Sequence, residues 1–324
     1  MNYKHFNMVS KYYGGFFNIE KPSQKLCYHS NLVLLSNGRA CISLIIKKLK
    51  IKKIYLPHYC CEEIKKLFYI KKIKIIFYKI NEKLEIDDEF NIQKDDYILW
   101  INYFNLKKEY FNKILKKKYK HNIILDNTHS FFEKENKSQI YFCSARKFFG
   151  VPDGAYVNIP NLNIKINNKT NPNLRFDHLY AEYENKKDRY EKFIKNEKKF
   201  SNQIYTANEY SKYLLKSINY ELAAKQRIKN YHTAHNLLGK INKCKFSLKI
   251  KQNCVPFCYP LVLKKNIRKI LWKNNIFIPY FWKNINKKAK IENLLLNNLH
   301  PIPIDQRYNE KEIYKICNII LRIK

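Results

Sequence analysis

The chain of 324 residues has few glycines, few acidic side chains and no long apolar run. Only 6 glycines are present, so two that fall close together mark a backbone that turns tightly. No stretch of about 18 apolar residues occurs, so no transmembrane helix is predicted. Residues 1–7 lack the apolar segment of a secretion signal, and we expect a cytoplasmic protein without membrane insertion.

The shortage of acids leaves a formal net charge of +36, from 63 Lys and Arg against 27 Asp and Glu. Such a charge can drive binding to nucleic acid or to another polyanion, which is one alternative function. The basic residues are spread along the whole chain rather than gathered in one arm, so no nucleic-acid partner is predicted. The charge instead favours small anionic substrates such as nucleotide diphosphates.

The 9 cysteines include no Cys-x-x-Cys pair, and no metal site is predicted from them. An odd number of cysteines without a secretion signal fits reduced thiols. Apolar residues make up 45% of the chain and aromatic residues 15%, which argues against disorder and provides for a substantial core.

Short apolar runs alternate with helical patterns in the first half of the chain. Strands are predicted over 32–35, 54–57, 73–78, 97–102, 123–126 and 140–143, and helices over 40–49, 61–69 and 109–118. This alternation predicts an α/β domain whose mostly parallel sheet is flanked by helices.

The second half predicts a smaller α+β domain. Helices are expected over 180–200, 209–238, 267–274 and 310–323, and strands over 254–263 and 276–280. We place the boundary so that residues 1–215 form the large domain and residues 216–324 the small C-terminal domain.

One carboxylate and one lysine stand out against this background. The strand 123–126 ends on Asp126, and Lys147 follows the strand 140–143 and precedes Gly150 and Gly154. Pyridoxal phosphate (PLP) needs a lysine amine that binds it and later moves a proton, and a carboxylate that keeps its ring nitrogen protonated. We therefore predict Lys147 as the catalytic lysine and Asp126 as the partner of the ring nitrogen. The alternative for Asp126 is a cap on the following turn.

Other residues could complete a PLP site. Gly38 and Arg39 lie at a strand-to-helix junction, where backbone N–H groups bind phosphate, although a plain helix N-cap explains them equally well. Tyr59 follows a predicted strand and would cover the ring, unless it only packs in the core. His129, three residues after Asp126, could bind the ring hydroxyl from the same loop.

These residues, in this order, resemble the DegT/DnrJ/StrS family of nucleotide-sugar aminotransferases. The similar segments are 14–17, 37–40, 56–59, 125–129, 146–154, Arg227 with Tyr231, and 303–308. The resemblance implies the fold type I architecture of aspartate aminotransferase, PLP as cofactor and an active site at a homodimer interface. It also implies that His129 meets the ring hydroxyl and that Ser144 binds the phosphate.

The resemblance further implies the reaction. Some family members carry histidine in place of the lysine and catalyse dehydration, so Lys147 implies amino transfer. The expected enzyme moves an amino group from a donor, glutamate, to a nucleotide-linked keto-sugar used in surface polysaccharide or glycan biosynthesis.

Three departures from the family pattern leave alternatives open. Asn105 stands where many members have glycine, Cys61 stands where others carry a ring-stacking aromatic residue, and Ser144 precedes Lys147 by three residues rather than five. The alternatives are a catalytically degenerate member that acts as a binding or partner subunit, and a PLP enzyme with a non-sugar acceptor.

Overall fold

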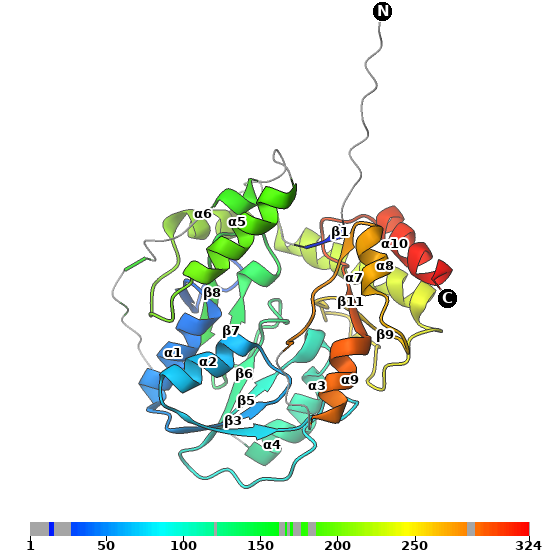
Figure 1. Ribbon diagram of the computed structural model, residues 1–324. Coiled ribbons are helices and arrows are strands. Elements are labelled where there is room, and N and C mark those ends of the chain that lie inside the picture. The colour runs from blue at the N-terminus through cyan, green and yellow to red at the C-terminus, as the bar shows by residue number, and fades with distance from the viewer. Residues whose placement is uncertain are drawn as a thin grey trace, which may run out of the picture.

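The central element of the protein is a seven-stranded sheet (Figure 1). The computed structural model describes residues 13–15, 27–119, 122–161, 166, 169–170, 176–180, 186–283 and 289–323. The strand order is β2-β8-β7-β6-β5-β3-β4. The strands are β2 (Val33–Leu35), β3 (Lys53–Pro57), β4 (Lys74–Tyr78), β5 (Tyr97–Ile101), β6 (Ile123–Asp126), β7 (Ile140–Ser144) and β8 (Ala155–Asn158).

The direction of the strands decides where a site can form. Strand β8 is antiparallel to both of its neighbours, β2 and β7, and the other pairings in the sheet are parallel. The six strands other than β8 therefore all run the same way. Because their carboxyl ends meet at one edge of the sheet, the residues that follow β2, β6 and β7 lie at the same edge.

Two helices of the large unit pack against strands of this sheet. Helix α1 buries seven consecutive residues, from Ala40 to Ile46, and contacts β7, β8 and α2. It begins where the side chain of Asn37 accepts a hydrogen bond from the Ala40 N–H at 3.0 Å. The helices are α1 (Gly38–Leu49), α2 (Glu62–Ile70), α3 (Lys108–Tyr110), α4 (Lys116–Tyr119), α5 (Lys186–Lys199) and α6 (Glu209–Ser217).

A second hydrophobic core lies in the C-terminal part of the chain. There β9 (Tyr259–Val262) pairs with β11 (Leu299–Ile302), and β10 (Ile276–Phe277) pairs with the N-terminal β1 (Tyr13–Gly14). The helices of this part are α8 (Arg268–Lys273), α9 (Lys290–Asn298) and α10 (Glu310–Arg322), and α10 packs on α7 (Tyr220–Leu238).

Helix α7 contributes to two clusters of buried residues. Its first buried residues, Tyr220 and Ala223, pack in a cluster with Phe148 and Phe149, whereas Tyr231, Ala234 and Leu238 pack in the C-terminal core. The predicted domain boundary at 215/216 falls in the last turn of α6, just before this shared helix, and stays a prediction.

Most predicted elements form, but several bounds differ. The helix predicted over 209–238 is two helices, because Asn219 caps α7 by accepting a hydrogen bond from the Leu222 N–H at 3.1 Å. The strand predicted over 254–263 starts only at Tyr259, because the backbone of Phe257 bonds elsewhere: its N–H donates to the Phe104 carbonyl and its own carbonyl accepts from the Arg227 guanidinium, both at 3.1 Å. Within the predicted helix 180–200, residues 181–185 lie outside the described part, and α5 starts at Lys186. The predicted helix 109–118 is interrupted by a π-helical turn, Phe111–Leu115.

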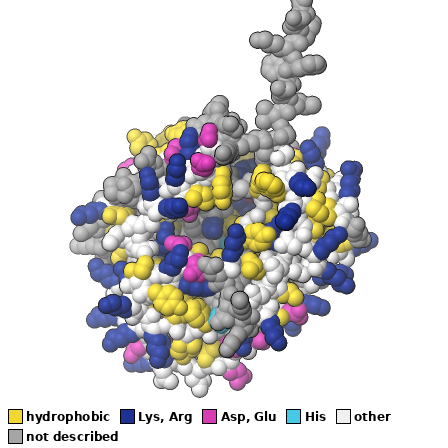
Figure 2. All heavy atoms as spheres, viewed as in Figure 1, with side chains coloured by type: hydrophobic (Ala, Val, Ile, Leu, Met, Phe, Trp, Pro, Cys, Tyr) yellow, Lys and Arg dark blue, Asp and Glu magenta, His cyan; other side chains and the backbone are white. Residues whose placement is uncertain are grey.

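Basic side chains are spread over the surface of the protein that Figure 2 shows. Figure 2 shows Lys and Arg side chains distributed over that face rather than gathered in one band. Among the helices that the structure describes, none combines the length and the hydropathy needed to cross a membrane.

Candidate active site

The buried carboxylate of Asp126 lies at the carboxyl end of β6, in the middle of the sheet. Its side chain is 2% exposed, and one oxygen accepts a hydrogen bond from the Thr128 N–H at 2.8 Å. Burial raises the pKa of this carboxyl to about 6, against the lowering effects of Thr128 and of the positive charge of Lys147. Asp126 therefore caps its turn, as one reading of the sequence expected, and its partnership with a ring nitrogen stays a prediction.

Lys147 stands on a short 3₁₀ helix, Ala145–Lys147, directly after β7. The two residues that follow it, Phe148 and Phe149, are buried, and their N–H groups both donate to the carbonyl oxygen of Ala145 at 2.9 Å. This tight turn fixes the backbone while the lysine side chain stays exposed. The charge of Lys147 acts on both Asp126 and His129, so the structure brings these three predicted residues together.

Gly154 ties the lysine turn to the start of α1. Its N–H donates to the Ser36 carbonyl at 2.8 Å, and its own carbonyl accepts from the Ala145 N–H at 3.1 Å. Gly154 has a φ of 129°, a conformation open to glycine, whereas Gly150 is not among the residues with positive φ. Of the two glycines that follow Lys147, only Gly154 has a backbone conformation that other residue types rarely adopt.

Replacing Gly154 with alanine is expected to lower the free energy of unfolding by about 2 kcal/mol. The φ value strains any L side chain, and the new Cβ would lie 3.3 Å from Cδ1 of Leu215. Urea denaturation measures the change. Gly15→Ala is the control, because its φ is +81° but no atom lies within 4 Å of the added Cβ. Equal losses in the two variants would contradict a contribution from the Leu215 contact.

His129 is enclosed by aromatic rings. It is 1% exposed and stacks on Phe257, with ring centroids 4.4 Å apart and planes 3° apart. Burial and the charge of Lys147 lower its pKa well below the usual range, so the imidazole is neutral at pH 7. Its Nδ1 is buried without a hydrogen-bond partner, which is costly unless a ligand supplies one.

Tyr59 is also enclosed and has an unpartnered polar atom. Its side chain is 0% exposed, and its hydroxyl oxygen has no hydrogen-bond partner. Trp282 lies edge-on to the Tyr59 ring at 4.7 Å and parallel to His129 at 5.8 Å. The sequence left open whether Tyr59 covers a cofactor or packs in the core, and in this structure it packs against Trp282.

The start of α1 supplies the predicted phosphate site. Asn37 is the helix N-cap, as one reading of the sequence expected. Gly38 opens the helix, and the Arg39 guanidinium donates to a carboxylate oxygen of Glu63 at 2.7 Å. Ser144 is the last residue of β7 and pairs with Ala155 of β8, which also pairs with Leu35 of β2. Because α1 follows β2, Ser144 and the start of α1 are two strands apart. Phosphate binding by these residues stays a prediction.

The presence of Asn105, where many members of the family have glycine, has a structural explanation. Asn105 has a φ of 63°, in the left-handed region where glycine is favoured and where asparagine is the most tolerated substitute. Its side chain also accepts a hydrogen bond from Asn102 at 2.9 Å and donates to Glu133 at 2.9 Å. The asparagine thus keeps the turn that a glycine would make. Cys61 is the N-cap residue of α2 and makes no side-chain capping bond there.

Two residues of the C-terminal part support the lysine turn. The Gln306 amide donates to the carbonyl oxygen of Phe148 at 2.7 Å, and Gln306 accepts from the Arg227 guanidinium at 2.8 Å. The Arg227 guanidinium also lies 4.5 Å from the centre of the Phe148 ring. Both residues belong to segments that resemble the family, and together they hold the residue next to Lys147. Segment 14–17 also resembles the family, but residues 16 and 17 lie outside the described part.

Asp153 connects the same turn to α6. Its carboxylate accepts a hydrogen bond from the Asn208 N–H, with distances of 3.2 and 3.3 Å to its two oxygens. Burial raises the pKa of this carboxyl to about 6. Asp153 therefore binds the backbone of the N-cap residue of α6.

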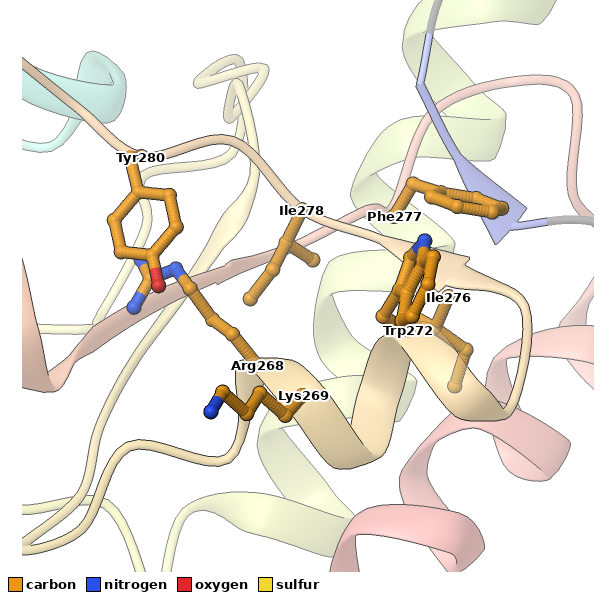
Figure 3. Close-up of a pocket in the computed structure, with 7 residues that line it drawn as sticks. All are labelled: Arg268, Lys269, Trp272, Ile276, Phe277, Ile278 and Tyr280. Atoms are coloured by element: carbon orange, nitrogen blue, oxygen red, sulfur yellow. The ribbon is translucent and has the colours of Figure 1, made fainter. Parts of the chain in front are cut away.

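A separate cavity of about 250 Å³ lies between α8 and β10 (Figure 3). Its lining residues are Arg268, Lys269, Trp272, Ile276, Phe277, Ile278 and Tyr280. None of these is a residue that the sequence predicted for the site.

The polar groups present fit PLP in chemical type. A carboxylate, an amine and a helix N-terminus meet at one edge of the sheet, which matches the ring nitrogen, the aldehyde and the phosphate. The unpartnered Nδ1 of His129 and hydroxyl of Tyr59 are further polar atoms without a partner in the described structure. Because both side chains are almost fully buried, aromatic neighbours such as Trp282 must shift when a ring enters.

Comparison with known proteins places the fold. No protein-family model and no curated protein matches the sequence. A DegT/DnrJ/EryC1/StrS aminotransferase from Brucella abortus matches with a TM-score of 0.60 and 10% identity, over 90% of this chain and 85% of that one. A sugar aminotransferase from Streptococcus pneumoniae in its PLP form matches with a TM-score of 0.62 and 10% identity, over 96% and 94%. DesI in the presence of its TDP-sugar product matches with a TM-score of 0.59 and 8% identity, over 89% and 79%.

The chain therefore has the α/β architecture of the fold type I aminotransferases, and the predicted fold class is confirmed. Within that class, it is similar to the DegT/DnrJ/EryC1/StrS sugar aminotransferases, as the sequence motifs indicated. At identities of 8 to 11%, this likeness is one of fold.

Proposed function

We propose that this chain is a PLP-dependent aminotransferase that acts on a nucleotide-linked keto-sugar. One observation carries the proposal: Asp126 and Lys147 stand at the carboxyl ends of the neighbouring strands β6 and β7, in a fold shared with sugar aminotransferases. Neighbours described in PLP and pyridoxamine-phosphate forms, and one described with a TDP-sugar product, support the cofactor and the substrate class.

The two central residues have distinct tasks. When bound, PLP supplies an electron sink for the negative charge that develops on a substrate carbon. The ionised Asp126 carboxylate would keep a proton on the ring nitrogen, and that positive charge would in turn lower the pKa of Asp126. The Nζ of Lys147 would hold the cofactor and later carry a proton between carbon atoms, as a general base and then a general acid.

The surrounding residues would orient the cofactor. The first N–H groups of α1, at Gly38 and Arg39, lie at the positive end of the helix dipole and would suit a phosphate. The neutral imidazole of His129 suits a hydrogen bond with the ring hydroxyl, and Tyr59 would cover a ring face. Ser144 would add a hydroxyl to the phosphate.

The finer parts of the proposal rest on the sequence resemblance. They are glutamate as amino donor, a homodimer with the site at its interface, a cytoplasmic location, and a product used in surface polysaccharide or glycan biosynthesis. A second candidate is a partner or binding subunit without catalysis, and the complete burial of Tyr59 and His129 by aromatic side chains favours it.

The test is a titration of the purified protein with PLP. We expect a yellow protein in which borohydride fixes the cofactor to a peptide that contains Lys147. Glutamate should then discharge the yellow colour, and a TDP-linked keto-sugar should restore it. A protein that takes up no PLP would reject the enzyme and support the binding subunit. Restoration by small keto acids alone would indicate a non-sugar acceptor.

A further inference from the structure

Glu197, on α5, lies among three positive side chains of the candidate site. The Arg146 guanidinium donates a hydrogen bond to the Glu197 carboxylate. Burial would raise the pKa of Glu197, but the charges of Arg146, Lys147 and Arg39 together hold it below its usual value. The carboxylate is therefore ionised at neutral pH, beside the predicted catalytic lysine and the predicted phosphate site.

The segment that follows α5 is hydrogen-bonded to α1 and to the residues just before it. The Asn37 amide donates to the Ser201 carbonyl at 3.2 Å, and the Ser43 hydroxyl donates to the Asn202 carbonyl at 2.8 Å. The Ser36 N–H donates to the Tyr205 carbonyl at 2.9 Å. The segment 201–205, just after α5, thus packs on the same helix N-terminus that the proposed phosphate would use.

The Arg146 guanidinium is held in place and keeps one donor without a partner. Its guanidinium carbon lies 4.2 Å from the centre of the Phe200 ring, which restricts its position. Its Nε is buried without a hydrogen-bond partner, and a planar guanidinium suits two oxygens of one phosphate. In this structure, the Glu197 carboxylate accepts a hydrogen bond from the Arg146 guanidinium.

The Arg146–Glu197 pair is partly exposed, at 17% and 38% for the two side chains, so it contributes little to folding. Its larger effect is on other anions. A second anion near Arg39, Arg146 and Lys147 would be repelled by Glu197 or would have to displace it, since like charges at close range oppose each other.

We propose that Arg146 is a phosphate-binding residue of this site, and that Glu197 is an internal counter-anion which the phosphate displaces. This inference rests on the proposed function in taking the phosphate to be that of PLP. It assigns a role to α5, which lies in a region without any motif.

The test compares Glu197→Gln with Glu191→Gln, an exposed residue on the same helix that carries the same charge. We expect Glu197→Gln to bind PLP about fivefold more tightly than the wild type, and Glu191→Gln to be unchanged. Pyridoxal, which lacks the phosphate, separates the effect on the phosphate from an effect on the lysine. Its affinity should not change in either variant. Unchanged or weaker PLP binding in Glu197→Gln, or an equal gain for pyridoxal, would overturn the proposal.

Arg146→Gln gives the opposite test. It should weaken PLP binding about tenfold and leave pyridoxal binding unchanged. If this variant does not fold, the Glu197→Gln comparison decides alone. If the wild type takes up no PLP, the proposed function fails, and inorganic phosphate still tests the exchange. Phosphate should then raise the melting temperature of Glu197→Gln more than that of the wild type, and equal shifts would reject the exchange.

Discussion

Replacing Lys147 with alanine is expected to abolish covalent uptake of PLP and to lower the transamination rate about 10⁴-fold. The Lys147 amine is the only lysine group whose charge acts on both Asp126 and His129 among the described interactions. Borohydride trapping measures the uptake, and a coupled assay of amino transfer measures the rate.

Two control variants separate chemistry from charge and from general damage. Lys147→Arg keeps the positive charge but cannot bind the aldehyde, so it should be as inactive as the alanine variant. Lys137→Ala changes an exposed lysine in the loop before β7 and should retain full activity. Activity within tenfold of the wild type in Lys147→Ala would place the catalytic amine elsewhere.

Replacing Asp126 with asparagine is expected to act in opposite directions on stability and on activity. The folded-state pKa of Asp126, about 6, lies above the usual 3.8, so burial of the ionised form destabilises the cofactor-free fold. The amide cannot ionise, and its oxygen can still accept from the Thr128 N–H. We expect a gain of about 2 kcal/mol in the free energy of unfolding at pH 7. The transamination rate should fall about 10²-fold or more, because no anion then faces the ring nitrogen.

The pH dependence of stability follows from the raised pKa of Asp126. Between about pH 4 and pH 6 the unfolded chain loses its Asp126 proton while the folded chain keeps it, so the wild type loses stability as the pH rises. The difference between Asp126→Asn and the wild type should therefore be full above pH 6 and vanish below about pH 4. Urea denaturation across this range measures it. Asp95→Asn, at an exposed position, should show no such trend, and a constant difference for Asp126→Asn would contradict the buried carboxylate.

The order of strands and helices in the large domain could be predicted from the sequence. Its short apolar runs are nearly fully buried, as in Ile123–Asp126 and Ile140–Ser144, so their hydrophobicity marks them. Strand β8 was missed, because nothing in the sequence after Gly154 distinguishes an antiparallel strand from a loop. The break between α6 and α7 was missed because apolar spacing continues across Ile218 while the cap at Asn219 depends on local geometry.

Some residues of the candidate site could likewise be predicted from the sequence, and others could not. Asp126 and Lys147 follow strands, so the sheet itself brings them to one edge, and sequence order was enough to predict their proximity. Glu197 could not be found in this way, because it meets Arg146 across 51 residues of chain and lies in a segment without a motif. Trp282 was missed for a related reason: its contacts with Tyr59 and His129 come from the packing of the C-terminal part on the sheet domain.

The support that Gln306 gives to the lysine turn has a consequence for the order in which a nascent chain matures. The turn that carries Lys147 is synthesised in the first half of translation, but the amide that binds the Phe148 carbonyl comes from residue 306. Strand β1, at Tyr13 and Gly14, likewise finds its partner only at Ile276 and Phe277. A growing chain can therefore assemble its large sheet early, since domains fold as their sequence emerges. The turn that presents the lysine is completed only when the last part of the chain has docked.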